Sequence, residues 1–495
     1  MKLKLSVFRL ALLLFTFVFL STATHILATP TKSQRPKPLA IETFNLAENL
    51  EVGLEINARS PGASWAREGA EAAALLISVD GVYNQDLLLW AGDELFQYRV
   101  MLGHLSRGRH TVLVAINLPR SAAKAQIAEV KALRPLLLAS TPRSGPAEED
   151  QLALAHSPVL YARANTIDHF TDIPLVMYYE ILRVAPGSLE SGLVRPAGTQ
   201  ESSLNVRGDE VAAKVPSNAE GDKRDLRGTD LIVRYTVVFT NEDGGTQTLA
   251  LMARWGRGTD IEWVYEFRLR DGNIIEETYQ GVSHETKAFT GSRIGGQHPL
   301  LAVASDNNNF SDLACSAVRF APLPIRADLE TATRESVMDR YPQTYRVMTE
   351  ELQREHRISP TPSGLNVIAD PRDYFYIEAS SEQTGAALGF DVKVAGQPEI
   401  YASDIGDPRL RIDRSGNFRT AVRLPHGVSP YAVESVTARC HATLQLVGER
   451  GCNHLKLLRV LMLDQNYVPQ ILFIQAQPEA SLAPGETKVF RLNQH

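Results

Sequence analysis

The stretch RGTDIEWVYEFRLRDGN, residues 257–273, decides the fold of the middle of the chain. Large apolar residues occupy its odd positions, and charged residues occupy most of its even positions. The apolar residues are Ile261, Trp263, Tyr265, Phe267 and Leu269, and the charged residues are Asp260, Glu262, Glu266, Arg268 and Arg270. A period of two is typical of a β-strand whose side chains alternate between a core and water. We therefore predict a strand with a buried odd row and a solvated even row, ended by the turn signal RDGN.

Strand and turn signals of the same kind flank this stretch. LIVRYTVVFT (231–240), TQTLALMARW (246–255) and IIEETYQ (274–280) are interpreted as further strands with short turns between them. Such a meander predicts an antiparallel sheet with one wet face, in a central antiparallel β domain over residues 151–322. Within that domain, residues 185–229 lose hydrophobicity and gain Gly, Ser, Pro and charge, so we expect a mobile loop there.

An N-terminal β-sandwich is predicted over residues 40–120. Apolar runs alternate with turn signals in this segment, and Asp80-Gly81 is a hairpin signal between two of the runs. The run GHLSRGRHTVLV (103–114) resembles the late strands of immunoglobulin-like and carbohydrate-module β-sandwiches, in which an L-x-x-G-x-H turn leads into an alternating strand. The resemblance implies an immunoglobulin-like fold for this segment and indicates no ligand.

A helix and a linker are expected over residues 121–150. SAAKAQIAEVKALRPLLL (121–138) has a helix-forming composition, with Ser121 as its cap and Pro135 near its end. Residues 140–150, STPRSGPAEED, have the composition of a linker.

A helical connector is expected over residues 323–364, followed by a second β-sandwich over residues 365–495. Residues 326–356 are the most helical part of the chain, and Pro342 divides or bends them. The C-terminal residues return to alternating strands and turns. The predicted fold class is thus mainly β: a multi-domain antiparallel β-sandwich and β-sheet protein with a short helical segment between the central and C-terminal domains.

The first residues have the pattern of a signal peptide over residues 1–23. Lys2, Lys4 and Arg9 flank the apolar run LALLLFTFVFL (10–20), and small residues follow it. The run is shorter than the roughly 20 residues that a membrane-spanning helix needs, although an uncleaved N-terminal anchor is the alternative. Residues 24–39 are polar and proline-containing, as in a disordered lead-in. We expect a secreted or periplasmic protein without a transmembrane segment after cleavage.

The charge of the chain argues against nucleic acid as a partner. The formal net charge is −6, and removal of residues 1–23 takes away three cationic and no acidic residues, which gives −9. A mildly acidic chain without a basic stripe is not expected to bind nucleic acid or anionic membranes.

The three cysteines are Cys315, Cys440 and Cys452. In an oxidising compartment, Cys440 and Cys452 can form a disulfide. The competing prediction is a hairpin that turns at residues 448–451, in which the two cysteines would lie roughly 23 Å apart. A Cys-His metal site that adds His441 and His454 is a third alternative, although its spacing matches no zinc pattern. We expect Cys315 to be a small buried residue.

Two carboxylates of the opening stretch are candidate catalytic groups. Strand spacing places Asp260 and Glu262 on one face, about 6.6–7 Å apart at Cα. Glycoside hydrolysis needs two carboxyl groups about 5–5.5 Å or 6.5–9.5 Å apart. His284 follows the strands and completes a candidate catalytic set, and the same residues with Asp306 are a candidate metal site. The alternative is that the acids only face water.

The run ASDNNNFSDL (304–313) is a candidate calcium site. It gathers Asp306, Asn308 and Asp312 in one loop, and such side-chain oxygens are the ligands that Ca²⁺ takes. The glycine and glutamate of an EF-hand are missing, and a hydrogen-bonded turn is the alternative.

No motif for a nucleophile or a phosphate-binding loop occurs in the chain. Aromatic residues at 177–179 and 374–376, with Trp90 and Trp255, are candidates for stacking against sugars, with core packing as the alternative. The leading hypothesis is an exported, non-catalytic binding or cell-surface-associated protein with carbohydrate as a candidate ligand. The alternatives are a secreted hydrolase of the glycoside type and a structural envelope component with envelope proteins as partners.

Overall fold

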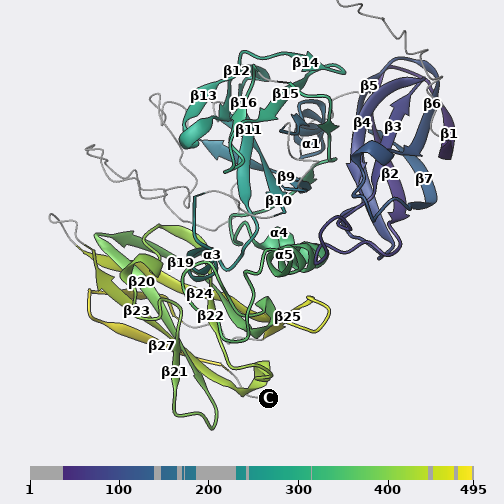
Figure 1. Ribbon diagram of the computed structural model, residues 1–495. Helices are drawn as coiled ribbons and strands as arrows, with labels where there is room; N and C mark the ends of the chain where they lie inside the picture. The colour runs from purple at the N-terminus through teal and green to yellow at the C-terminus, as the bar shows by residue number, and fades with distance from the viewer. Residues whose placement is uncertain are drawn as a thin grey trace, which may run out of the picture. The chain divides into compact units, whose positions relative to one another are not determined.

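The computed structural model in Figure 1 describes most of the chain after residue 36. The described residues are 37–138, 146–163, 170–171, 173–184, 230–240, 245–313, 315–443, 450–472 and 478–492. The predicted signal peptide and the predicted loop at 185–229 lie outside them. Residues Pro38–His495 form one compact unit. No helix of the described part is long and apolar enough to cross a membrane.

Residues 38–138 form two β-sheets that share one core, and this part extends past the end of the sandwich predicted over residues 40–120. One sheet has the order β1-β6-β3-β4 and the other β5-β2-β7. The bounds are β1 Pro38–Leu46, β2 Leu50–Arg59, β3 Ala74–Val79, β4 Val82–Leu88, β5 Phe96–Leu105, β6 Gly108–Ile116 and β7 Glu129–Leu138. Both residues of the Asp80-Gly81 turn have positive φ, which suits a tight hairpin between β3 and β4. The first strand starts at Pro38, inside the predicted lead-in.

The predicted helix over residues 121–138 is wrong. Residues Glu129–Leu138 form β7, which pairs along the whole of β2. Because β7 is the edge strand of its sheet, Pro135 lies opposite Leu54 without removing a hydrogen bond from a central ladder. Helix propensity is a weak preference, and pairing with a buried partner strand outweighs it here.

In the described residues, the central part combines two sheets and two α-helices. The larger sheet has the order β13-β12-β11-β10-β9-β18, and the smaller one β14-β15-β8-β17 with β16 beside β15. The bounds are α1 Pro146–Ala155, β8 Val159–Tyr161, β9 Pro174–Val184, β10 Asp230–Phe239, α3 Thr248–Trp255, β11 Ile261–Arg270, β12 Asn273–Gln280, β13 Thr286–Ala288, β14 Arg293–Ile294, β15 His298–Val303, β16 Phe310–Ser311, β17 Arg319–Phe320 and β18 Ile325–Arg326. Most pairs are antiparallel, but β18 runs parallel to β9 and β15 parallel to β8.

The predicted strand at residues 246–255 is wrong, because Thr248–Trp255 is the helix α3. Its buried residues include Leu251, Met252 and Trp255, a spacing of three to four that suits a helix face. The helix ends at Gly256, which has φ 63° in the left-handed region. The chain therefore passes from β10 to β11 through a helix and not through the predicted strand with its short turns.

Replacement of Gly256 by alanine is expected to lower the free energy of unfolding by about 1–3 kcal/mol. A Cβ atom at this position would strain the left-handed backbone and would lie 2.8 Å from Cγ of Arg419, a buried side chain. Urea denaturation of the variant measures the loss. Gly364→Ala is the matched control, because Gly364 also has positive φ but has nothing within 4 Å of the added Cβ.

Most of the even row is buried, so the predicted solvated face is wrong for this part of the strand: Asp260, Glu262 and Arg268 are buried, Glu266 is half-buried and Arg270 is exposed. Tyr235 lies opposite Tyr265 and Thr236 opposite Trp263, which leaves Val264 as an extra residue on β11. This β-bulge inverts the alternation, so that Glu262, opposite Val237, shares a face with the core residues beyond the bulge. The other face is also covered, since Ile261 and Val238 belong to the core that contains residues of the helices α4 (Ser336–Arg340) and α5 (Gln343–Arg354).

The helices after the central part confirm the division at Pro342. The helix α4 spans Ser336–Arg340, and α5 spans Gln343–Arg354 with Pro342 as its N-cap residue. Proline is tolerated at a helix start, where its missing N–H has no partner to lose.

The C-terminal part is the predicted second β-sandwich. One sheet has the order β22-β19-β24-β25, with β26 beside β24, and the other β21-β20-β23-β27. The bounds are β19 Tyr374–Thr384, β20 Ala386–Val394, β21 Ile400–Ala402, β22 Gly416–Arg423, β23 Val433–Ala442, β24 Gly451–Leu463, β25 Pro469–Leu472, β26 Ala480–Leu482 and β27 Thr487–Arg491. Residues of both sheets share one core, which includes Phe375, Phe390 and Phe418.

A disulfide joins Cys440 to Cys452, with a Cα–Cα distance of 6.0 Å. Cys440 lies on β23 and Cys452 on β24, so the bond connects the two sheets of the sandwich. Of the alternatives for these cysteines, the structure has the disulfide and not the hairpin, because β23 and β24 pair with other strands. The prediction for Cys315 is wrong, since this free cysteine is exposed.

Candidate functional site

A groove of about 430 Å³ lies where the N-terminal sandwich meets the central sheet. Its walls come from the end of β4, the start of β5, the start of β9, residues 320–325 and the junction of α4 and α5. Backbone bonds from Met101 N to Ala321 O and from Leu323 N to Arg99 O attach residues 321–323 to β5, the edge strand of its sheet. The groove opens beside the earlier residues of the same strand.

Four aromatic rings form the floor of the groove. The ring centroid of Phe96 lies 4.7 Å from that of Trp90, 4.9 Å from that of Tyr98 and 6.4 Å from that of Tyr341. Trp90 and Tyr98 are buried, whereas Phe96 and Tyr341 are half-buried. Burial raises the pKa of Tyr341, so its phenol is neutral at physiological pH. Phe96 and Tyr341 therefore offer flat, uncharged surface to a ligand.

Polar side chains surround this floor. Arg99 forms an ion pair with Glu55 at 3.1 Å and donates to Gln97 at 3.0 Å. On the opposite side, Gln343 donates to Glu94 at 2.6 Å. The rim thus combines guanidinium, carboxamide and carboxylate groups, which can donate hydrogen bonds to a ligand and accept them from it.

Of the candidates predicted from the sequence for stacking against sugars, Trp90 and Met177 line this groove. The predicted catalytic and calcium-binding residues do not line it, but the structure brings several of them together elsewhere. Nδ2 of Asn308 donates to Asp260 at 2.8 Å. Nε2 of Gln280 lies 2.5 Å from both a Glu262 oxygen and Nδ1 of His284, and His284 lies 3.8 Å from Glu262. Asp260, Glu262, His284 and Asn308 thus lie in one region, where carboxamides bond the two carboxylates.

The hydrogen bonds of this region suit buried carboxylates more than catalytic ones. Asp260 is 1 % exposed and Glu262 is 8 % exposed, and each accepts a hydrogen bond from a carboxamide. A buried carboxylate is tolerated only with such partners. The bulge at Val264 and the loop at 304–309 together place these partners, and neither contribution can be read from the spacing of Asp260 and Glu262.

The three calcium candidates bond to different partners and not to a common site. Asp306 pairs with Arg163 near the surface. Asn308 donates to Asp260, as described above. Asp312 accepts from Tyr279 at 3.1 Å and from the backbone of Thr290 at 2.7 Å. Within the described residues, no group of three or more His, Cys, Asp or Glu side chains is placed to hold a metal ion. We therefore base no function on calcium.

Sequence reasoning missed a serine–histidine–glutamate chain. Ser157 Oγ lies 3.3 Å from Nδ1 of His298, and Nε2 of His298 lies 3.0 Å from Glu51. Nδ1 also lies 2.8 Å from the carbonyl oxygen of Ser157, which can only accept, so this nitrogen carries a proton and cannot take one from the hydroxyl. Since Ser157 is 1 % exposed, the chain connects β2 to β15 and is not a nucleophile site.

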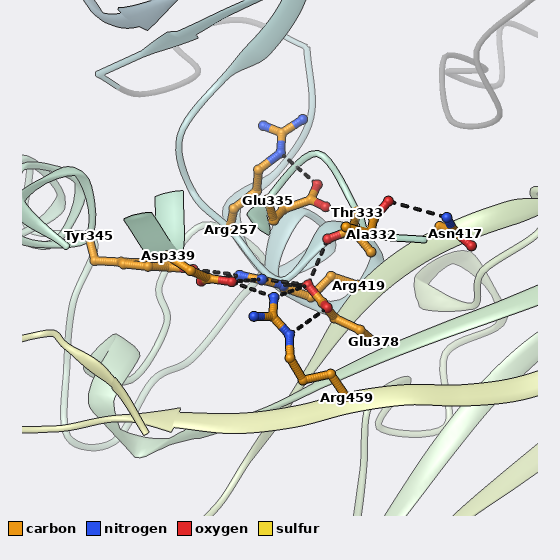
Figure 2. A network of polar contacts seen from close by, with 10 residues as sticks. All are labelled: Arg257, Ala332, Thr333, Glu335, Asp339, Tyr345, Glu378, Asn417, Arg419 and Arg459. Carbon is orange, nitrogen blue, oxygen red and sulfur yellow. Dashed lines mark hydrogen bonds and ion pairs between the residues drawn. The ribbon is translucent and has the colours of Figure 1, made fainter. Parts of the chain in front are cut away.

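A buried ion cluster, also absent from the sequence predictions, joins the connector to the C-terminal sandwich (Figure 2). Arg419 on β22 is fully buried and pairs with Asp339 of α4 at 2.6 Å and with Glu378 of β19 at 2.5 Å. Arg459 of β24 bonds to the other oxygen of Glu378 at 2.8 Å. Burial alone would raise the pKa of Glu378, but Arg419 and Arg459 outweigh it and lower the pKa to about 2. These ion pairs connect α4 to β19, β22 and β24.

Comparison with known proteins assigns no family. No protein-family model matches the chain, and no curated protein matches its sequence.

Proposed function

We propose that the protein is an exported, non-catalytic binding protein whose groove takes a neutral carbohydrate. The observation that carries the proposal is the half-exposed pair of rings of Phe96 and Tyr341 within a polar rim. Sugar rings bind through their apolar faces to aromatic side chains, and their hydroxyls bond to nearby polar groups.

The rim supports a neutral ligand more than a charged one. The cationic Arg99 is already paired with Glu55, and the anionic Glu94 is paired with Arg346 at 2.9 Å. Arg99 can donate hydrogen bonds to ligand hydroxyls, and Glu94 can accept hydrogen bonds from them. Each group is paired with one of opposite charge, so neither pair carries a net charge. A hydroxyl-rich ligand uses both kinds of bond.

Export rests on the signal-peptide pattern of residues 1–23, together with the disulfide between Cys440 and Cys452. Disulfides persist in oxidising compartments and are rare in reducing ones. A secreted or periplasmic location is therefore part of the proposal, and it is tested by whether a full-length chain expressed in its own host loses its first residues and leaves the cytoplasm.

Replacement of Phe96 or Tyr341 by alanine is expected to weaken glycan binding about tenfold or more, which corresponds to roughly 1.4 kcal/mol or more. The loss follows from the removal of the surface on which the sugar ring stacks. A glycan array identifies the ligand, and isothermal titration calorimetry on the best hit measures the change in Kd.

Tyr431→Ala is the matched control for these variants, because Tyr431 is 72 % exposed and lies outside the groove. Gln97→Ala changes an exposed rim residue and serves as a second test if loss of a floor ring impairs folding. A glycan that binds wild type, Phe96→Ala and Gln97→Ala equally well would place its site elsewhere and refute the assignment of the groove.

The same assay separates the glycoside-hydrolase alternative. A hydrolase that uses Asp260, Glu262 and His284 would release reducing ends from the bound glycan, and Glu262→Gln would abolish the release. We expect no release, because both carboxylates are buried and bonded to carboxamides away from the groove. The envelope-component alternative predicts instead that proteins of the envelope co-purify with the chain.

A further inference from the structure

Two arginines, Arg254 and Arg414, lie over the indole ring of Trp255, and a third, Arg257, is close enough to act on the charge of Arg414. Arg254 is the next-to-last residue of α3, Arg257 follows the helix after Gly256, and Arg414 precedes β22 of the C-terminal sandwich. The guanidinium carbon of Arg254 lies 4.8 Å from the ring centroid of Trp255, and that of Arg414 lies 4.9 Å from it. We call Arg254, Arg257 and Arg414 the arginine cluster.

The arginine cluster has more cationic side chains than acidic partners. Arg254 pairs with Asp413 at 2.6 Å, and Arg257 pairs with Glu335 at 3.3 Å, as Figure 2 shows for the second pair. Arg414 donates to the backbone oxygen of Arg254 and not to a carboxylate. These contacts leave one positive charge in excess.

Two guanidinium nitrogens of the cluster are buried without a hydrogen-bond partner, Nε of Arg254 and Nη1 of Arg414. A buried donor without an acceptor is destabilising. Burial lowers the pKa of Arg414 to about 9, and the charges of Arg254 and Arg257 act in the same direction, yet the group stays charged at neutral pH. The arrangement therefore destabilises the folded protein, and a negatively charged hydrogen-bond acceptor would stabilise it.

We propose that the arginine cluster is a binding site for a tetrahedral oxyanion, a phosphate or sulfate group, held against Trp255. Guanidinium groups bind such oxygens strongly, because their N–H groups are planar and carry charge. Asp413 is exposed and Arg414 is half-buried, so the cluster lies near the surface of the protein. The site is separate from the groove, so this proposal does not depend on carbohydrate binding.

The test is titration of the full chain with inorganic phosphate and with sulfate, against chloride at the same ionic strength, by calorimetry and by tryptophan fluorescence. We expect saturable binding of phosphate or sulfate, with a fluorescence change that is absent from Trp255→Phe. Phosphate that binds no more tightly than chloride in wild type would overturn the proposal. Comparison with a sugar phosphate then shows whether the group is taken as a free ion or as part of a larger ligand.

Arg414→Met is expected to weaken oxyanion binding about ten- to a hundredfold, because it removes one charged hydrogen-bonding group. Arg254→Lys keeps the charge but removes the planar N–H groups of the guanidinium, and we expect it to weaken binding less. Arg409→Met is the matched control, because Arg409 is an arginine of the same sandwich whose side chain is 74 % exposed and pairs with Asp407. Unchanged binding in both cluster variants would also refute the site.

Thermal melting checks folding and gives a second readout. Without phosphate, Arg414→Met should melt no lower than wild type, because it removes a buried cation that has an unbonded nitrogen. With phosphate, the melting temperature of wild type should rise by mass action and that of Arg414→Met should not. Equal rises in wild type and Arg414→Met would contradict the proposal.

Discussion

The Arg419→Met variant is expected to lose about 3–5 kcal/mol of unfolding free energy, the largest effect that we predict. Methionine keeps much of the volume of the side chain but removes its charge. Glu378 and Asp339 would then remain buried, at 3 % and 7 % side-chain exposure, with Arg459 as their remaining guanidinium partner among the described contacts. A buried charge that loses its partner costs more than the original pair contributed.

Several bonds end on this one guanidinium, which is why the loss should be large. Arg419 also donates to the hydroxyl of Tyr345 on α5, and Glu378 accepts from Thr333 at 2.7 Å (Figure 2). The cluster thus joins three strands of the C-terminal sandwich to the connector. Urea denaturation followed by circular dichroism measures the change, and Arg409→Met, at an exposed arginine, should change stability by less than about 0.5 kcal/mol.

A double variant separates lost charge pairing from lost packing. If Arg419→Met destabilises mainly by removing one of the two guanidinium partners of Glu378, then adding Glu378→Gln should cost less in the Arg419→Met background than in wild type. Additive losses, or a loss below about 1 kcal/mol for Arg419→Met alone, would contradict the role of the ion cluster.

The second large effect is a loss of stability of roughly 3 kcal/mol when the pH falls from about 6.5 to about 4, caused by His156 alone. This histidine follows α1, is 8 % exposed, and lies with its ring 4.9 Å from that of Phe267. Burial lowers its pKa from 6.5 to about 4, and the positive charge of Arg293 acts in the same direction.

The sign follows from the difference in protonation between the two states. Between pH 6.5 and pH 4, unfolded His156 binds a proton and folded His156 does not, so the unfolded state binds more protons. Stability must then rise with pH across this window and fall as the solution is acidified. Below the folded pKa the loss is complete.

Replacement of His156 by phenylalanine keeps a flat ring beside Phe267 and removes the titration. We expect this variant to be roughly 2–3 kcal/mol less sensitive than wild type to a change from pH 7 to pH 4.5, measured by urea denaturation at each pH. His426→Gln is the matched control, because the side chain of His426 is 92 % exposed. The same acid sensitivity in His156→Phe and wild type would show that other groups cause the loss.

Local pattern predicted the kind of backbone at several places where it is strong. The alternation at residues 261–269 predicted the strand β11, and Pro342 predicted the division between α4 and α5. Both signals arise within a few residues of the chain, because they reflect the period of a strand or the missing N–H of proline. The β-sandwiches at both ends followed from the same kind of repeated alternation and turn signals.

Pattern failed where local preferences were nearly balanced. Residues 129–138 have helix-forming composition and form β7, whereas residues 248–255 were interpreted as a strand and form α3. Pairing with β2 decides the first case, and burial of one helix face decides the second. A preference of a few tenths of a kcal/mol per residue cannot compete with such contacts.

The sequence by itself thus determined the mainly β architecture and the strand β11, which contains Glu262 and begins directly after Asp260. Only the tertiary structure decided that these acids are buried, because the bulge at Val264 depends on the pairing of β10 with β11. The groove, the ion cluster of Arg419 and the arginine cluster each combine residues that are far apart in the chain. Periodicity reports which way a side chain points from its own backbone, whereas what meets that side chain is set by long-range packing, which no local window contains.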